Sequence, residues 1–179
     1  GATLTNDRNG KANSAYNFNG DQQFIRIPNS LELHNIGQSM TISAWVTVKE
    51  WYLGAWGAVA CKATAGKPHF QFQLYFDGKD GSFATDGRLN NKSKFKMDLG
   101  KWYHLVLMID GKTRRYFVNG ELIGVETDLP FIEPDYSPLE FGRDFYAVTE
   151  FHIGALDDIR IYNRTLSLSE INALYKADN

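Results

Sequence analysis

The chain has 179 residues, of which 43% are hydrophobic and 22% charged, and this is enough apolar material for one soluble globular domain with a sizeable core. Its formal net charge of −2 argues against a nucleic-acid-binding protein, which needs clustered Lys and Arg. The single cysteine, Cys61, excludes an intrachain disulfide, and no apolar stretch reaches the length of a membrane span.

Short strands with two different faces dominate the first part of the chain. Residues 41–48 alternate at period two, and residues 70–76 place Phe and Leu at every second position in the same way. Residues 102–109 are more uniformly apolar, which is typical of a central strand. The segments 77–100 and 126–138 are rich in turn residues and are expected to be mainly surface connections.

Two consecutive hairpins are the clearest local signal. Asp110-Gly111 and Asn119-Gly120 favour tight antiparallel turns, so residues 102–109, 114–118 and 122–125 are predicted to form three neighbouring strands. A last strand at 159–162 precedes one helix. Ser167 and Glu170 match a capping box there, and the helix has an apolar stripe of Ile171, Leu174 and Tyr175. The fold class is therefore all-β, a two-sheet antiparallel sandwich with one short C-terminal helix.

Four segments, in order, resemble the laminin-G-like, concanavalin A-like jelly rolls of bacterial carbohydrate-active and adhesive proteins. They are Ala15-Tyr16-Asn17-Phe18-Asn19-Gly20, Thr41-Ile42-Ser43-Ala44-Trp45-Val46, Trp102-Tyr103-His104-Leu105 with Tyr116-Phe117-Val118-Asn119-Gly120, and Asp157-Asp158-Ile159-Arg160-Ile161-Tyr162-Asn163-Arg164. The resemblance implies one jelly-roll domain over residues 1–179, belonging to a larger secreted or cell-surface protein. It fixes no function, because this fold hosts lectins, glycosidases and adhesion modules.

Catalysis is not expected. Glycosidases need two carboxyl groups about 5–5.5 Å or roughly 6.5–9.5 Å apart. The family 16 glycoside hydrolases, which share the fold, carry alternating Glu, Asp and Glu on one strand, and this chain has no such triplet. Its nearest approach, Glu133-Pro134-Asp135, lies in a proline-rich loop. The four histidines show no zinc spacing, and His104, inside a strand, is expected to be a hydrogen-bonded structural residue.

The resemblance implies a structural calcium ion between a Gly carbonyl and an Asp that enters the last strand. The matching positions are Gly20 and Asp157. By parity Asp157 shares a face with Ile159 and Ile161, so its carboxylate is expected to be buried and to need a partner. Calcium would serve, and the alternative is that Asp157 accepts backbone N–H groups or pairs with a base.

A polar and aromatic sheet face is the candidate for ligand binding. Parity places Trp45 opposite the apolar face of residues 41–48, and places Gln71, Gln73 and Tyr75 opposite the apolar face of residues 70–76. Stacking rings and planar amides suit a sugar, and Trp51 and Trp56 extend this set. The alternative is that each aromatic ring is packed, with Trp45 covered by a loop.

The sequence thus predicts a non-catalytic module that binds a glycan or polysaccharide. The alternatives are a protein-interaction or structural laminin-G adhesion module and, as the less favoured one, a glycoside hydrolase. An open groove lined by Trp45, Gln71, Gln73 and Tyr75 would favour glycan binding over adhesion.

Overall fold

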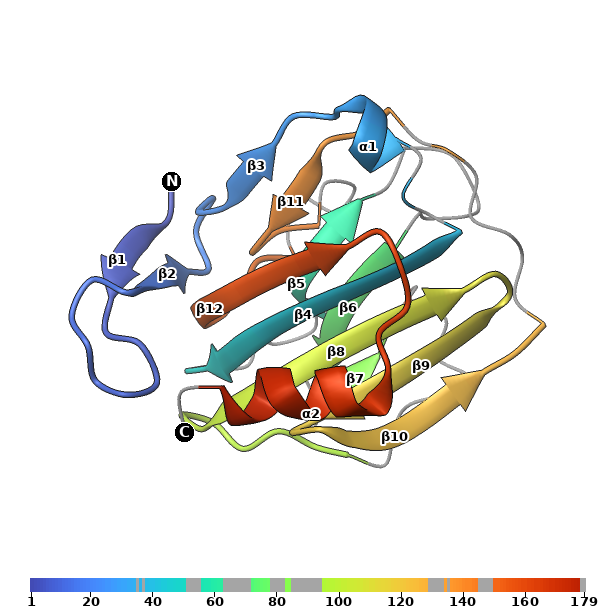
Figure 1. Cartoon of the computed structure of the whole chain (residues 1–179). Coiled ribbons are helices and arrows are strands. Elements are labelled where there is room, and N and C mark those ends of the chain that lie inside the picture. Colours follow the sequence, from blue (N-terminus) through green and yellow to red (C-terminus); the bar gives the residue numbers. More distant parts are fainter. Residues whose placement is uncertain are drawn as a thin grey trace.

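Two antiparallel sheets face each other in the computed structural model (Figure 1). It describes residues 1–34, 36, 38–50, 56–62, 72–77, 83–84, 95–128, 134, 136–144 and 150–177, with backbone only for Trp56 and residues 72–77 and 83–84. Sheet A has the order β1 (Thr3–Thr5), β2 (Ala15–Asn19), β12 (Ile153–Tyr162), β4 (Ser39–Val48), β8 (Trp102–Asp110), β9 (Thr113–Val118) and β10 (Glu121–Glu126). Sheet B has the order β3 (Ile25–Ile27), β11 (Leu139–Phe141), β5 (Trp56–Lys62), β6 (Phe72–Asp77) and β7 (Phe83–Ala84).

The two predicted hairpins are confirmed, although the first turn consists of Gly111 and Lys112 rather than Asp110 and Gly111. The strand predicted at 70–76 is β6 from Phe72 onward, and residues 70 and 71 lie outside the described residues. The strand predicted at 102–109 is β8, which lies between β4 and β9, and β8, β9 and β10 pair consecutively as antiparallel neighbours. Asn119 and Gly120 form the two-residue loop between β9 and β10, with φ of 51° and 83°. Positive φ at both positions is what a type I′ turn requires, so the Asn-Gly pair sets the register of this hairpin.

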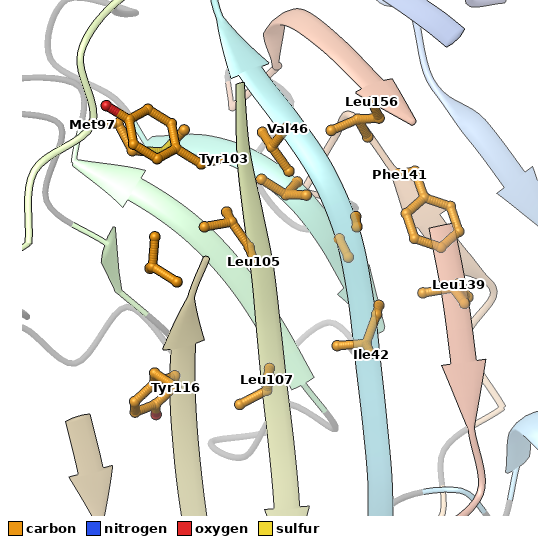
Figure 2. Close-up of a cluster of buried hydrophobic side chains, with 14 of the residues drawn as sticks. Ile42, Val46, Met97, Tyr103, Leu105, Leu107, Tyr116, Leu139, Phe141 and Leu156 are labelled. Atoms are coloured by element: carbon orange, nitrogen blue, oxygen red, sulfur yellow. The ribbon is translucent and has the colours of Figure 1, made fainter. Parts of the chain in front are cut away.

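The main core lies between the two sheets. Apolar residues of β4 and β8 alternate toward it, and β11 of sheet B supplies Leu139 and Phe141 from the other side. Figure 2 shows these two side chains facing Ile42 and Val46 of β4 across the gap between the sheets. Leu139 and Phe141 are at most 2% exposed, so the apolar residues at every second position of β11 form part of the buried core.

A second apolar cluster lies on the outer face of sheet A, under the helix α2 (Leu168–Lys176). Figure 1 shows α2 lying across this sheet on the side away from sheet B. The predicted capping box is confirmed, because Ser167 accepts the N–H of Glu170 and the Glu170 side chain accepts the N–H of Ser167. Buried Ile171 packs with Val106 and Phe117 of the sheet.

A four-residue helix, α1 (Leu31–His34), connects sheet B to β4. Among the described residues, no helix has the length and apolar character needed to cross a membrane.

Candidate functional site

Trp45 is packed, and the prediction that it offers an open face to a sugar is wrong. The residue is 5% exposed. Its ring stacks on Tyr175 of α2 with centroids 5.7 Å apart, and the guanidinium carbon of Arg8 lies 4.5 Å from its centroid. The predicted parity is right, since Trp45 points away from the main core, but α2 and the β1–β2 loop cover that face.

His104 lies beside Trp45 on the same covered face, paired across the β4–β8 ladder. It is 0% exposed, and its Nε2 lies 2.8 Å from the Ser43 hydroxyl, which confirms the expected structural histidine. Burial, assisted by the positive charges of Arg160 and Arg8, lowers the pKa of His104 to about 4. The imidazole is therefore neutral at pH 7.

Asp157 is buried, as predicted, but on the outer face rather than the core face. It pairs with Trp45 in the β12–β4 ladder, whereas its neighbour Leu156 belongs to the main core. The parity argument failed because of a β-bulge: the register shifts between Asp157 and Arg160, and Asp158 has φ of 48°. One extra residue reverses the alternation, so Ile159 packs against the core while Asp157 does not.

Gly20 and Asp157 are not brought together. Gly20 follows Asn19, which pairs with Ile153, and Asp157 lies four residues further along β12. At about 3.3 Å per residue, the two positions are separated by more than roughly 13 Å. Among the described residues, no group of three or more His, Cys, Asp or Glu side chains is placed to hold a metal ion. The geometry therefore does not fit the calcium site that the resemblance implied.

The alternative expected for Asp157 is the one observed. Its Oδ1 accepts the backbone N–H of Asp158 at 2.8 Å, and its Oδ2 accepts Nη1 of Arg8 at 3.0 Å. Burial raises the pKa of Asp157, and the Arg8 charge opposes that rise. Arg8 lies in the β1–β2 loop beside a polar hollow of about 540 Å³, which is lined by Asp7, Arg8, Asn9, Lys11, Ser14, Asp157 and Asp158.

The outer face of sheet B carries the second group of polar side chains. The register aligns four positions in a row across β3, β11, β5 and β6: Arg26 pairs with Glu140, Glu140 with Cys61, and Cys61 with Gln73. Glu140 lies between the core residues Leu139 and Phe141 and therefore on the opposite face of β11. Two of the predicted ligand-binding positions belong to the same strand, Gln73 in this row and Tyr75 beside Ala58.

Two arginines bind the Glu140 carboxylate, and both lie over one phenylalanine ring. Arg26 Nε donates to Glu140 at 2.6 Å, and Arg143 donates through Nε and Nη2, each at 2.9 Å. Both guanidinium groups lie over the ring of Phe24, with Arg143 at 3.9 Å and Arg26 at 5.5 Å from its centroid. Glu140 is fully buried, whereas the Arg26 side chain is 45% exposed. The buried carboxylate thus fixes an exposed guanidinium beside an aromatic ring.

A carboxyl pair lies next to this cluster. Burial and the neighbouring Asp144 carboxylate, which shares a hydrogen bond with Glu150, raise the pKa of Glu150 to about 7. Cys61, buried as predicted, donates its thiol to Asp144 at 3.3 Å. A glycosidase places a sugar between two carboxyl groups about 5 Å or more apart, and a hydrogen-bonded pair leaves no room for one.

The remaining predicted residues are described in part. Trp51 and Gln71, like Glu133 and Asp135, lie outside the described residues, and Trp56, Gln73 and Tyr75 are placed by their backbone in β5 and β6. The roles proposed for these side chains in ligand binding stay predictions.

Sequence reasoning missed Arg8, Arg26 and Glu140. For Glu140 a signal existed, because Leu139-Glu140-Phe141 alternates like a strand with one polar face. For Arg8 none did, since its partners Asp157 and Asp158 are about 150 residues further along the chain.

A two-sheet sandwich with these strand pairings and one C-terminal helix defines a jelly roll of the lectin-like class. The chain belongs to the concanavalin A-like lectin/glucanases superfamily, whose laminin-G-type family model matches residues 19–172. Comparison with curated protein sequences gives no match.

Similar solved structures share the fold at low sequence identity. Domain 4 of AbnA, an extracellular arabinanase of Geobacillus stearothermophilus in complex with arabinotriose, is 20% identical with a TM-score of 0.73, over 98% of this chain and 82% of that one. Trypanosoma rangeli sialidase, in complex with a difluorosialic acid, is 19% identical with a TM-score of 0.73, over 97% of this chain and 29% of that one. A SAP-like pentraxin of Limulus polyphemus is 17% identical with a TM-score of 0.60, over 79% and 71%. The chain thus spans less than a third of the sialidase.

Proposed function

We propose that this chain is a non-catalytic carbohydrate-binding module of a secreted or cell-surface protein with further domains, and that it binds glycan on the outer face of sheet B. The observation that carries this proposal is the cluster of Phe24, Arg26 and Arg143 around buried Glu140. Sugar binding needs planar donors held in a fixed direction beside an aromatic ring. Arg26 has this geometry, because its carboxylate partner cannot move into solvent.

We place the binding site on sheet B because the outer face of sheet A is covered. The outer face of sheet A is covered by α2, so its aromatic and polar residues are engaged in packing. On sheet B the register places Gln73 of β6 in the Glu140 row, and Tyr75 lies two residues further along the same strand. Gln71, Trp51 and Trp56 complete the proposed binding set.

The similar structures agree with this class of ligand and this setting. Domain 4 of the arabinanase, of which this chain covers 82%, is a complex with arabinotriose and supports the class of ligand. The sialidase, of which this chain covers 29%, supports only the setting within a larger glycan-processing protein. Because both are parts of glycan-processing proteins, a domain of this fold placed next to a catalytic domain is the setting we propose here.

A glycan array that includes arabino-oligosaccharides and sialylated glycans, run with and without calcium, tests the proposal. We expect binding to at least one glycan class, and no release of reducing ends when that glycan is incubated with the protein. Arg26→Ala should weaken binding about thirtyfold, the equivalent of losing an anchor contact worth about 2 kcal/mol.

The matched control is Arg115→Ala, which removes an arginine from β9 of sheet A whose ion pair with Asp110 spans 3.9 Å. It should bind like the wild type. A silent array would favour the adhesion module instead. An Arg26→Ala variant with unchanged glycan affinity would place the binding site away from the Glu140 cluster. Reducing ends that appear with the wild type and vanish in Glu150→Gln would identify a glycosidase.

A further inference from the structure

We infer that the Arg8 guanidinium is the built-in cation of the Asp157–Asp158 carboxylate pair at the bulge in β12, so that this pair needs no calcium ion. Nη1 of Arg8 donates to Asp157 at 3.0 Å and to Asp158 at 2.8 Å. The Arg8 side chain is 5% exposed, so this is an interior ion pair rather than a surface contact.

The charges of this cluster balance without a metal ion. Asp158 also receives Nη2 of Arg160 at 3.1 Å, so two guanidinium groups face two carboxylates. An arginine is protonated at every pH at which the protein is folded, whereas a calcium ion must be bound from solution. Asp7 and Lys11, which both line the neighbouring polar hollow, add one negative and one positive charge and leave this balance unchanged. A divalent ion that reached the pair would have to displace Arg8.

Arg8 also connects the two ends of the chain, which a bound ion alone would not do. Its Nη2 donates to the carbonyl of Ala177, the C-cap of α2, at 3.1 Å. A helix C-terminus carries partial negative charge, so a cation is favoured there. The guanidinium plane also covers the ring of Trp45. The β1–β2 loop, the bulge in β12 and the end of α2 are therefore held by one side chain.

The thermal stability of the wild-type protein tests the inference directly. We expect the same Tm in excess EDTA and in millimolar calcium chloride, within about 1 °C. By mass action a calcium ion that bound the folded state at a hundred times its dissociation constant would add roughly 2.7 kcal/mol, which corresponds to several degrees in a chain of this size. A Tm that falls in EDTA and returns with calcium would overturn the inference.

Variants of Arg8 separate the role of counter-ion from simple packing. Arg8→Ala should lower Tm by roughly 10 °C, since it leaves two carboxylates with one fewer cation in a largely buried cluster. Arg8→Lys should lose less, because it keeps the charge but not the fork that reaches both carboxylates and Ala177. Arg115→Ala is the control arginine and should shift Tm by no more than about 1 °C.

The double variant Arg8→Ala/Asp157→Asn distinguishes the two roles. If Arg8 acts as a counter-ion, removing the negative charge recovers part of the loss, so the double variant melts above Arg8→Ala alone. Additive losses would mean that Arg8 only fills space, and would overturn the inference. Should Arg8→Ala fail to fold, the same comparison made with Arg8→Gln, which removes the charge but keeps more of the side chain, together with the wild-type calcium experiment, still separates a counter-ion from a packing residue. Glycan binding takes no part in these measurements.

Discussion

The outer faces of the two sheets look alike in sequence and differ in the structure. Each has aromatic and polar residues at the positions that alternate with the core. On sheet A these residues face away from the main core but are still buried, because Trp45 and His104 lie under α2 and Arg8. On sheet B a buried carboxylate, Glu140, orients two arginines, and one of them is 45% exposed. Alternation therefore tells which residues avoid the core, but the rest of the chain decides whether they reach solvent.

The largest effect expected from this comparison is on Trp45. Trp45→Ala should destabilise the protein by about 3–5 kcal/mol, because it empties the space between sheet A, Tyr175 and Arg8. Arg26→Ala should cost less, about 1–3 kcal/mol, because it removes one donor from buried Glu140 but leaves the two hydrogen bonds from Arg143. Urea unfolding of both variants measures the difference. A Trp45→Ala variant as stable as Arg26→Ala would mean that the indole is not a packing residue.

Local signals accounted for most of the fold. The alternation of β4, the Asn119–Gly120 turn and the capping box of Ser167 and Glu170 each depend on residues a few positions apart, and each is present as predicted. These features are set by backbone geometry and short-range hydrogen bonds, which a sequence displays directly.

The candidate site depended on contacts that a sequence does not display. Trp45 is covered by Tyr175, which is 130 positions later in the chain, so its burial follows from the docking of α2. The face of Asp157 is set by a bulge at Asp158, where no glycine marks the left-handed backbone. The cation at Asp157 comes from Arg8, near the other end of the chain. Parity holds only while a strand stays regular, and partners distant in sequence need the assembled sheets.

The next largest effect is a pH dependence that belongs to sheet A. The pKa of His104 is lowered to about 4 in the folded state, below the ordinary value of 6.5. Between pH 6.5 and 4 the unfolded chain therefore binds a proton at His104 that the folded chain does not bind. The free energy of unfolding falls as the pH drops over this range. The loss from this group is about 3 kcal/mol. Urea unfolding at pH 7 and pH 4 measures the summed loss from His104 and the other buried histidine, His152.

A variant assigns this pH dependence to its source. His104→Gln should remove the contribution of His104 and leave that of His152, which is fully buried and whose pKa is also lowered to about 4 by burial. The slope of stability against pH should thus be reduced but not abolished. An unchanged slope in His104→Gln would show that His104 is not the group that titrates.

The smallest effect concerns the first turn of α2. A change there tests whether the helix that covers sheet A can be weakened without changing glycan binding on sheet B. Ser167 accepts the N–H of Glu170, and Glu170 is held by Ser167 and by Arg164 at 2.6 Å. Arg164 and then Ser167 lower the pKa of Glu170 to about 2. The stabilisation of the folded state by the Glu170 carboxylate is therefore present above pH 4.5 and is lost as the pH falls toward 2.

Ser167→Ala should cost about 1 kcal/mol in urea unfolding, the usual value of an N-cap. Ser39→Ala, an exposed serine at the start of β4, is the control and should cost less than about 0.5 kcal/mol. Because the cap belongs to the helix over Trp45, Ser167→Ala should also make tryptophan fluorescence easier to quench with acrylamide, while the affinity of any glycan bound on sheet B stays unchanged. A loss of glycan affinity in Ser167→Ala would mean that the two faces are coupled, and that the helix contributes to binding after all.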